Sequence, residues 1–324
     1  MRKLQYAGAI TEAMREEMAR DDNVFLIGED VDLFGGVYKL SAGLVEEFGA
    51  RRVRGTPISE AAFCGLATGA AMAGLRPIVE IMYFDFVMVA MDQVANQMAK
   101  ISYMSGGQVR VPMVVRGQFG SGTAEAAQHS QHLESWFCHT PGVKVVMPSN
   151  AYDAKGLLKS AIRDDDPVIY LENRVLYYKE EDVPDGEWIV PLGKAAVKRR
   201  GTDVTVVALS DAVNKSLAAA EALEGKVSVE VIDPRSLAPL DLDTILESVG
   251  ETGRLLVVHE APTRGGFGAE IVRLVVEEGF DLLDAEPVVL GARHVPVPFS
   301  HVLETAYVPQ VGDIEAAIRR MVGA

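Results

Sequence analysis

The sequence predicts an α/β protein of two domains, and three features of the chain indicate this fold class. From Val24 to Asn173, short apolar runs rich in β-branched residues alternate with segments of helical character. From Arg174 to Arg200 the alternation lapses into charged sequence that contains Pro and Gly. A second, shorter alternation then continues to the C-terminal end. Apolar strands separated by helices are typical of a parallel sheet covered on both faces.

The N-terminal segment, MRKLQYAGAITEAMREEM, predicts an amphipathic helix that carries acidic residues. It lacks the apolar core of a signal peptide. The longest uncharged run, from Ala61 to Leu75, is shorter than a bilayer span and rich in Gly. We therefore expect a cytoplasmic protein without membrane contact or, in a eukaryote, a protein of the mitochondrial matrix or plastid whose leader has been removed.

The first domain is expected to cover residues 1–189, with a linker from about residue 174. Its apolar runs predict strands at residues 24–30, 76–86, 111–117, 144–149 and 167–173. The segments between them predict helices at residues 59–75, 87–101 and 152–164. The charged stretch KEEDVPDGE falls inside the expected linker.

The second, smaller α/β domain is expected to cover residues 190–324. Its apolar runs predict strands at residues 204–210, 227–233, 254–260 and 287–293. Its helices are expected at residues 214–224, 241–250 and 266–279, with a closing helix from Asp313.

Composition excludes several classes of protein. With 324 residues and 48% hydrophobic side chains, the chain can bury a sizeable core. The net charge of -15 and the lack of a dense Lys/Arg cluster argue against nucleic acid as a partner and favour a basic protein. The only cysteines, Cys64 and Cys138, stand in apolar sequence and predict two buried thiols in a reducing compartment.

Residues 56–65 read TPISEAAFCG and place the carboxylate of Glu60 beside small apolar residues. One interpretation is structural: Ser59 caps a helix, and Glu60 interacts with the positive end of its dipole. The other is functional, because a carboxyl group held beside apolar surface has a raised pKa and can exchange protons.

Small residues recur along the same predicted helix, with Gly65, Gly69 and Ala73 on one line. Such spacing lets another backbone approach closely, although each Gly costs about 1 kcal/mol of helix stability relative to Ala. The line predicts either a contact between subunits or a crowded packing site within the chain.

Histidines gather in AAQHSQHLESWFCH, at positions 129, 132 and 139. No acidic or cysteine ligand follows at a zinc-like spacing, so the pattern disfavours a metal site. A single His acting as a proton donor fits better, because the segment follows the strand at 111–117 and parallel sheets place their sites at the carboxyl ends of strands. The stretch GGFGAE at 265–270 opens a helix and is a weak dinucleotide fingerprint.

Together the motifs resemble the β subunit of the thiamine-diphosphate-dependent decarboxylating component of 2-oxo acid dehydrogenase complexes. The resemblance runs in order from about Tyr6 to the end of the chain. It is carried by these motifs: TPISEAAFCG, AGLRPIVEIMYFDF, MDQVANQMAK, YMSGGQVRVPMVVR, AAQHSQHLESWF, PGVKVV, DAKGLLKSAIRDDDPVIYLEN and IDPRSLAPLD. It implies a parallel-sheet pyrimidine-binding domain followed by an α/β domain like the C-terminal domain of transketolases.

The resemblance also implies site residues. Glu60 matches the family's Glu that hydrogen-bonds the pyrimidine nitrogen N1′ of thiamine diphosphate. Phe86 matches the aromatic residue packed on the pyrimidine ring, and Ile58 would line the same pocket. His129 matches the His that faces the reacting end of the cofactor and the incoming lipoyl group, where a near-neutral pKa suits protonation of a lipoyl sulfur or stabilisation of the first adduct.

A structural potassium site in the family is built largely from backbone carbonyls at the end of the helix DAKGLLKSAIRDD. By position, the resemblance maps its ligands onto Met113, Ala161, Ile162, Asp164 and Asp166.

The implied chemistry suits a carboxylic acid at N1′. The cofactor's own 4′-amino group must become an imine before it can take the proton of the thiazolium carbon, and an acid at N1′ promotes that tautomer. The cofactor then carries the decarboxylation and the reductive acylation of a lipoyl group, while the protein orients it.

One motif of diphosphate-binding chains is missing. Such chains hold Mg²⁺ through a GDG segment followed by Asn-Asn, whereas GD occurs here only at Gly312-Asp313. The resemblance therefore implies that an α subunit supplies the diphosphate and Mg²⁺ half of the site in an α₂β₂ heterotetramer. A lipoyl acyltransferase core, docked in part through the C-terminal domain, would be the further partner.

The substrate is ranked by the motifs YMSGG and AAQHSQ, which favour pyruvate, then acetoin, then branched-chain 2-oxo acids. The loop residue Glu125 departs from the family's usual small or apolar residue. Two rivals stay open: a non-catalytic scaffold of the same fold, and half of a split transketolase-like enzyme, which would need phosphate-reading His and Arg residues.

Overall fold

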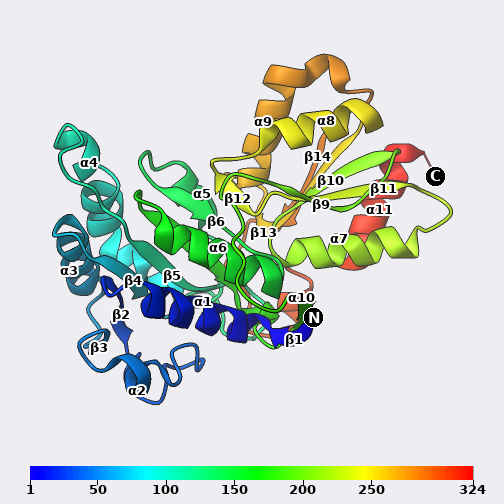
Figure 1. The fold of residues 1–324 in the computed structure, drawn as a ribbon. Helices are drawn as coiled ribbons and strands as arrows, with labels where there is room; N and C mark the ends of the chain where they lie inside the picture. Colours follow the sequence, from blue (N-terminus) through cyan, green and yellow to red (C-terminus); the bar gives the residue numbers. More distant parts are fainter. Residues whose placement is uncertain (324) are drawn as a thin grey trace. The chain divides into compact units, whose positions relative to one another are not determined.

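The structure, a computed structural model, describes residues 1–323. The chain divides into two compact units. The first unit joins Met1–Phe119 to Trp136–Leu192, and the second joins Gly120–Ser135 to the chain from Gly193 onward. The loop before Trp136 thus groups with the second unit, which the sequence patterns do not indicate. Figure 1 shows the elements of both units.

The first unit is built on a parallel sheet in the order β6-β7-β5-β4-β2-β3. Its strands are β2 (Val24–Glu29), β3 (Val53–Thr56), β4 (Arg76–Glu80), β5 (Val114–Phe119), β6 (Lys144–Val146) and β7 (Val168–Asn173). Strands β2, β5 and β7 are buried along their whole length, as near-continuous apolar runs predict for a sheet covered on both faces. The predicted parallel sheet is confirmed.

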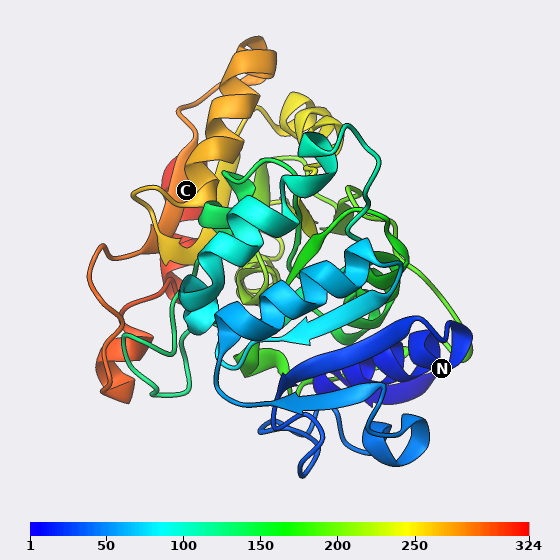
Figure 2. The same cartoon turned by 90° about the vertical axis from the view of Figure 1, so that its left-hand side faces the viewer.

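Helices cover this sheet on its two faces. Helices α1 (Tyr6–Arg20) and α6 (Ala151–Arg163) lie side by side (Figure 1). Helix α3 (Glu60–Met72) packs on β4 and beside the segment from Phe84 to Met98 (Figure 2). Two short helices are α2 (Leu44–Phe48), which lies in the first unit, and α5 (Glu134–Cys138), which spans the boundary of the two units in the sequence.

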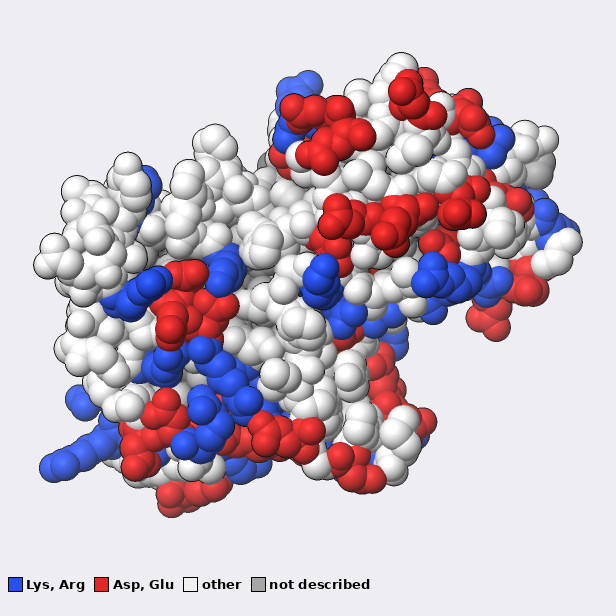
Figure 3. All heavy atoms as spheres, turned by 45° about the horizontal axis from the view of Figure 1, so that its top comes forward, with Lys and Arg blue, Asp and Glu red and all other residues white. Residues whose placement is uncertain are grey.

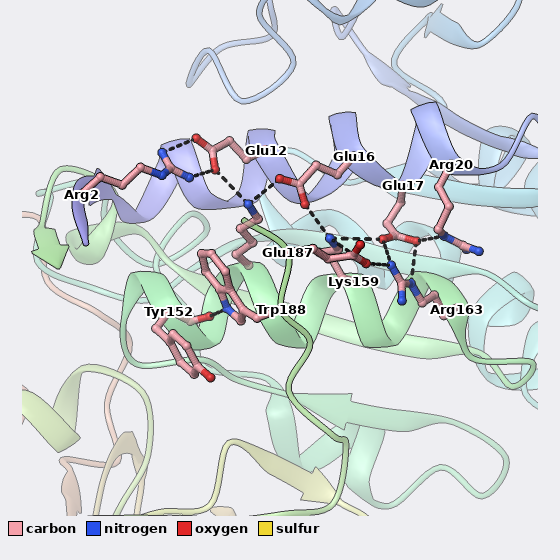
Figure 4. A network of polar contacts seen from close by, with 11 residues as sticks. Arg2, Glu12, Glu16, Glu17, Arg20, Tyr152, Lys159, Arg163, Glu187 and Trp188 are labelled. Atoms are coloured by element: carbon pink, nitrogen blue, oxygen red, sulfur yellow. Dashed lines mark hydrogen bonds and ion pairs between the residues drawn. The ribbon is translucent and has the colours of Figure 1, made fainter. Parts of the chain in front are cut away.

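An ion-pair network joins α1 to α6. Glu12, Glu16 and Glu17 of α1 face Lys155, Lys159 and Arg163 of α6 (Figure 4). The side chains of Glu17, Lys155 and Lys159 are buried. Each buried charge thus has an opposite partner, which the low dielectric of the interior requires.

The single helix predicted over residues 87–101 is wrong in type. The structure has a 3₁₀ helix at Phe84–Ala90, a π-helix at Asp92–Met98 and a short α4 at Ile101–Met104. The amide of Ala99 donates to the carbonyl of Val94, five residues back, at 3.1 Å. A widened turn of this kind leaves no mark in side-chain periodicity, so the pattern could not reveal it.

The predicted linker is also more ordered than its composition indicates. Strand β8 (Glu180–Val183) pairs antiparallel with β1 (Arg2–Gln5), after a 3₁₀ turn at Arg174–Leu176. Lys3 lies opposite Asp182 and donates to its carboxylate at 2.9 Å. The charged run is a strand because it pairs with β1, where Lys3 compensates Asp182, whereas charge normally indicates a loop.

Trp188 fastens the end of this segment to α6. Its ring stacks on Tyr152 with centroids 5.4 Å apart and 4° between planes, and its Nε1 donates to the Tyr152 carbonyl at 3.0 Å. The ammonium of Lys155 lies 4.5 Å from the Trp188 ring centroid. The segment before the second unit is therefore held by stacking, a hydrogen bond and a cation–π contact.

The second unit has a sheet in the order β14-β13-β10-β11-β9, parallel except for the pairing of β9 with β11. Its strands are β9 (Ala196–Arg199), β10 (Val204–Ala208), β11 (Val229–Asp233), β13 (Leu255–Pro262) and β14 (Val288–Ala292), and the short β12 is Ser236–Ala238. Its helices are α7 (Asp211–Ala222), α8 (Leu242–Thr252), α9 (Phe267–Gly279), α10 (His301–Thr305) and α11 (Val311–Val322), with a 3₁₀ turn at Phe280–Leu282. Figure 1 shows α7 beside α11 and α8 beside α9. The predicted second α/β domain is confirmed.

The surface agrees with the net charge of -15. Acidic side chains form rows on the face shown in Figure 3, with basic side chains interspersed. No helix within residues 1–323 combines the length and apolar character that a membrane crossing requires.

The two cysteines differ in burial. Cys64 is buried, and burial followed by the nearby Glu60 charge raises the pKa of its thiol to about 12. Cys138 is partly exposed, so the prediction of two buried thiols is wrong for this residue. Neither cysteine forms a disulfide within residues 1–323.

Candidate active site

Glu60 is the first residue of α3, directly after the turn that follows β3. Its side chain is only 5% exposed. Ser59 occupies the cap position, but its side chain caps no backbone amide and its hydroxyl donates to the Pro57 carbonyl at 3.1 Å. The prediction that the Ser59 side chain caps the helix is therefore wrong, because its hydroxyl contacts the preceding turn and not a helix amide. Glu60 stands in the first turn of the helix, where the helix dipole favours negative charge.

Glu29 is a second buried carboxyl group near Glu60, and the sequence analysis missed it. It ends β2, opposite Thr56 of β3, and is 5% exposed. Burial, then the charges of Glu60, Asp30 and Glu80, raise its pKa to about 7. Its Oε1 has no hydrogen-bond partner within residues 1–323. The sequence feature that could have identified Glu29 is its position at the carboxyl end of a predicted parallel strand, where open parallel sheets place their sites.

A buried ion cluster lies behind these two carboxyl groups. Arg116 of β5 binds Glu80 of β4 and Glu172 of β7, donating to Glu172 Oε2 at 2.7 Å. The hydroxyl of Tyr177 donates to the same oxygen at 2.8 Å. Burial and the Glu172 charge outweigh Arg116 and raise the pKa of Glu80. The cluster ties three neighbouring strands together at buried positions.

The other two residues expected around the pyrimidine ring differ in exposure. Phe86 is half-buried in the 3₁₀ helix that follows β4. Ile58, between β3 and α3, is 82% exposed. The first unit therefore brings Glu60 to Glu29 and leaves Ile58 free to contact another molecule.

His129 lies in the irregular loop after β5, as predicted, within the part of the chain that groups with the second unit. It is partly buried, and its amide donates to the Ala126 carbonyl at 3.3 Å. His139 directly follows α5 in the sequence, and its side chain is exposed. The part of the chain that the structure describes contains no group of three or more His, Cys, Asp or Glu able to hold a metal.

Beneath this loop, the second unit buries further titratable groups. Burial, then the neighbouring His132, lowers the pKa of His259 to about 4. Burial, opposed by a backbone hydrogen bond, and then Glu260 raise the pKa of Glu134 to about 7. Glycines 266, 268 and 291 press on the His259 ring, so a Cβ there would approach the imidazole to within 3 Å. Burial therefore favours the neutral form of both His259 and Glu134.

The residues expected to bind potassium come from two segments: Ala161, Ile162, Asp164 and Asp166 lie at or just after the end of α6, and Met113 lies just before β5. The Arg76 guanidinium donates to the carbonyls of Ile162 at 3.2 Å and Asp164 at 2.9 Å. The amide of Val168 donates to the Met113 carbonyl at 3.0 Å. Each of these oxygens has a second lone pair, so an added cation would share them with existing donors.

The small residues of α3 were predicted to serve either a contact between subunits or packing within the chain, and the structure distinguishes Gly65 from Gly69 in this respect. A Cβ added at Gly65 would approach the Gln93 amide oxygen at 3.0 Å, whereas one added at Gly69 would meet no described atom within 4 Å. Packing within the chain therefore accounts for Gly65 and leaves Gly69 open.

Comparison with known proteins identifies both units. The family described as transketolase, pyrimidine binding domain, matches residues 2–179, and the family described as transketolase, C-terminal domain, matches residues 193–314. A solved structure described as split gene transketolase, inactive beta4 tetramer, has the same fold with a TM-score of 0.79. It is 22% identical and covers 97% of each chain.

Curated relatives match almost the whole chain. The pyruvate dehydrogenase E1 component subunit beta of Rickettsia bellii is 48% identical over 314 residues, covering 97% of both chains. The acetoin:2,6-dichlorophenolindophenol oxidoreductase subunit beta of Bacillus subtilis is 47% identical over 335 residues, covering 99% of this chain and 98% of that one. The chain therefore belongs to the thiamine-diphosphate-dependent family of pyruvate dehydrogenase E1 component β subunits, built from a transketolase pyrimidine-binding domain and a transketolase C-terminal domain.

Proposed function

We propose that the chain is the β subunit of a decarboxylating component that oxidatively decarboxylates a 2-oxo acid, with pyruvate favoured, and acylates a lipoyl group. The observation that carries this proposal is the sequence similarity to pyruvate dehydrogenase β subunits, which is 48% identity over 97% of the chain. The paired buried carboxyl groups of Glu60 and Glu29 at the carboxyl edge of the sheet support it, because proton exchange with a cofactor needs such groups shielded from water.

The first unit fits the pyrimidine half of thiamine diphosphate. Glu60 would hydrogen-bond N1′, Phe86 would pack on the ring, and Ile58 would close the pocket. The unpartnered Oε1 of Glu29 supplies a further polar group beside Glu60. When bound, the cofactor supplies the electron sink for decarboxylation. The task of Glu60 is to hold or release a proton at the ring nitrogen while its burial excludes water.

His129 is proposed to act at the other end of the reaction. An imidazole in a loop at the carboxyl end of β5 can reach an incoming group, and its ring nitrogens can hold and transfer a proton to a lipoyl sulfur. The buried His259 is unsuited to this task, because burial holds it neutral in the physiological range.

The remaining half of the site is proposed to come from an α subunit, which would hold the diphosphate and Mg²⁺ in an α₂β₂ heterotetramer. The lack of a GDG motif supports this division, as do the exposed Ile58 and the open space at Gly69. A lipoyl acyltransferase core is the proposed further partner, and carbonyls of Met113, Ala161, Ile162, Asp164 and Asp166 are the proposed potassium ligands.

Acetoin oxidation is the second candidate, because the Bacillus subtilis acetoin relative matches as closely as the pyruvate dehydrogenase subunits. Turnover by the complex co-expressed with its α subunit should be measured with pyruvate, acetoin and 2-oxoisovalerate. We expect the highest kcat/KM with pyruvate and a requirement for both chains. A higher kcat/KM with acetoin would identify acetoin as the substrate. Tight binding of the whole cofactor with Mg²⁺ by this chain alone would refute a site shared with an α subunit.

A further inference from the structure

The loop from Gly120 to Leu133, which carries His129, has an unusual backbone. It contains no helix or strand, and Gly122, Ala124 and Ala126 have φ values of 112°, 58° and 62°. Alanine rarely adopts the left-handed region, because its Cβ then approaches the following carbonyl oxygen. Two such residues within three positions require contacts that hold them there.

Glu304 supplies those contacts. Its carboxylate accepts hydrogen bonds from the amide of Gly122 at 2.6 Å and from the amide of Ala124 at 2.9 Å. Both partners belong to the second unit, and the two bonds join α10 to a loop 180 residues earlier in the sequence. Amides of one loop that converge in this way form a concave site for an anion, and here the anion is a side chain of the same protein.

Burial makes this pair of bonds specific. Glu304 is 1% exposed, and no Lys or Arg within residues 1–323 forms an ion pair with it. Its charge is therefore compensated by the loop amides, through charge-assisted bonds that are stronger than those between neutral groups. A carboxylate whose main partners are two amides of one loop holds that loop in one conformation.

We propose that Glu304 is a positioning residue that fixes the loop from Gly120 to Gln131 and thereby orients the imidazole of His129 for its reaction with the lipoyl group. The inference rests on the function proposed for His129. It adds a residue far away in sequence that touches neither substrate nor cofactor.

The first test concerns the loop itself, in the complex with the α subunit. Hydrogen exchange of the loop peptides should be compared for Glu304→Ala, Glu304→Gln and the control Glu278→Gln, which changes an exposed Glu of α9. We expect at least tenfold faster exchange at residues 122–126 in Glu304→Ala, a smaller increase in Glu304→Gln, which keeps one acceptor oxygen, and no change in the control. Unchanged exchange in Glu304→Ala, in a protein with unchanged circular dichroism, would overturn the proposal.

The second test separates the two half-reactions. Decarboxylation is measured with an artificial electron acceptor, and reductive acylation with a lipoylated acceptor domain. We expect Glu304→Gln to impair the same half-reaction as His129→Ala, by about tenfold or more, and the double variant to be no worse than His129→Ala alone. Multiplicative losses in the double variant would show that Glu304 does not act through His129 and would overturn the proposal.

Failure of the underlying function gives a different result. If His129→Ala leaves both half-reactions unchanged while Glu304→Ala still accelerates loop exchange, the role of His129 is refuted and Glu304 is a loop anchor without a catalytic consequence. That outcome overturns the positioning role, whereas faster exchange together with non-additive kinetics supports it.

Discussion

At the scale of single residues, the proposed site contains two buried carboxyl groups, and only one of them stands in a motif that the sequence analysis could use. Glu60 stands in a motif and could be found from it. Glu29 ends an ordinary apolar strand, and only the register of β2 against β3 shows that it lies near Glu60. Its proximity is a property of the fold and could not be read from local pattern.

The first prediction concerns Glu60. Glu60→Gln keeps the shape of the side chain but cannot exchange a proton, so kcat of the complex should fall by about 10²- to 10⁴-fold. The thermal stability of the complex should change little. Steady-state kinetics with pyruvate and a melting curve provide the measurements, and an unchanged decarboxylation rate would revive the non-catalytic scaffold.

The second prediction concerns the pH dependence caused by Glu29. Because the folded state raises its pKa from 4.5 to about 7, folding binds a proton more tightly, so this contribution to stability is complete below pH 4.5 and is lost as the pH rises through 7. Glu29→Gln should therefore gain stability relative to the unsubstituted chain by about 1–2 kcal/mol between pH 5 and pH 8.

Urea unfolding of both proteins at the two pH values measures this difference, and all other titrating groups cancel in the comparison. A gap between the two proteins that stays constant with pH would show that Glu29 titrates at its ordinary value in the folded state.

At the scale of elements, the sequence predicted strands and long helices well because burial repeats along them. It failed where local conformation or a distant partner decides. The π-helix at Asp92–Met98 depends on backbone bonds, and β8 depends on its pairing with β1, more than 170 positions away. The same limit applies to the site, since no motif links Glu304 to the loop of His129.

The third prediction tests the α1–α6 network. Glu17 is fully buried, and although burial opposes its charge, Arg163 and Arg20 lower its pKa. Glu17→Gln leaves these cations without their shared partner and should cost about 2–4 kcal/mol of unfolding free energy at pH 7. Since a lowered pKa stabilises the fold only above the unfolded value, the loss should shrink as the pH falls below 4.5.

Chemical denaturation at pH 7 and at pH 4 provides the measurement. Glu46→Gln, which changes an exposed Glu of α2, is the control and should alter stability by less than about 0.5 kcal/mol. An effect of Glu17→Gln no larger than this would mean that water solvates Arg163 and Arg20 as well as Glu17 does.

At the scale of the whole molecule, the fold class could be predicted because each unit repeats a simple alternation of strand and helix. The grouping of the loop at 120–135 with the second unit could not, because it depends on contacts such as that of Glu304.

The fourth prediction concerns assembly through α3. Gly69→Leu places a side chain where no described atom of this chain lies within 4 Å, so the fold of the isolated chain should be preserved. In the complex with the α subunit, the same side chain should block close helix packing and lower the mass below that of α₂β₂. Light scattering after size-exclusion chromatography measures this.

Gly312→Ala, at a position of α11 that is equally open, is the matched control and should assemble normally. Normal α₂β₂ mass for Gly69→Leu would place the subunit contact elsewhere on the chain.

Because Trp188 is attached to α6, its fluorescence can report on the segment that carries it. The chain has two tryptophans, and Trp136 is 46% exposed, whereas Trp188 is stacked on Tyr152 and covered by Lys155. In a Trp136→Phe background, emission from the single remaining indole would report whether the segment leading out of the first unit stays attached. Detachment would shift that emission to longer wavelength, so release of this segment could be followed in real time and separately from unfolding of either sheet.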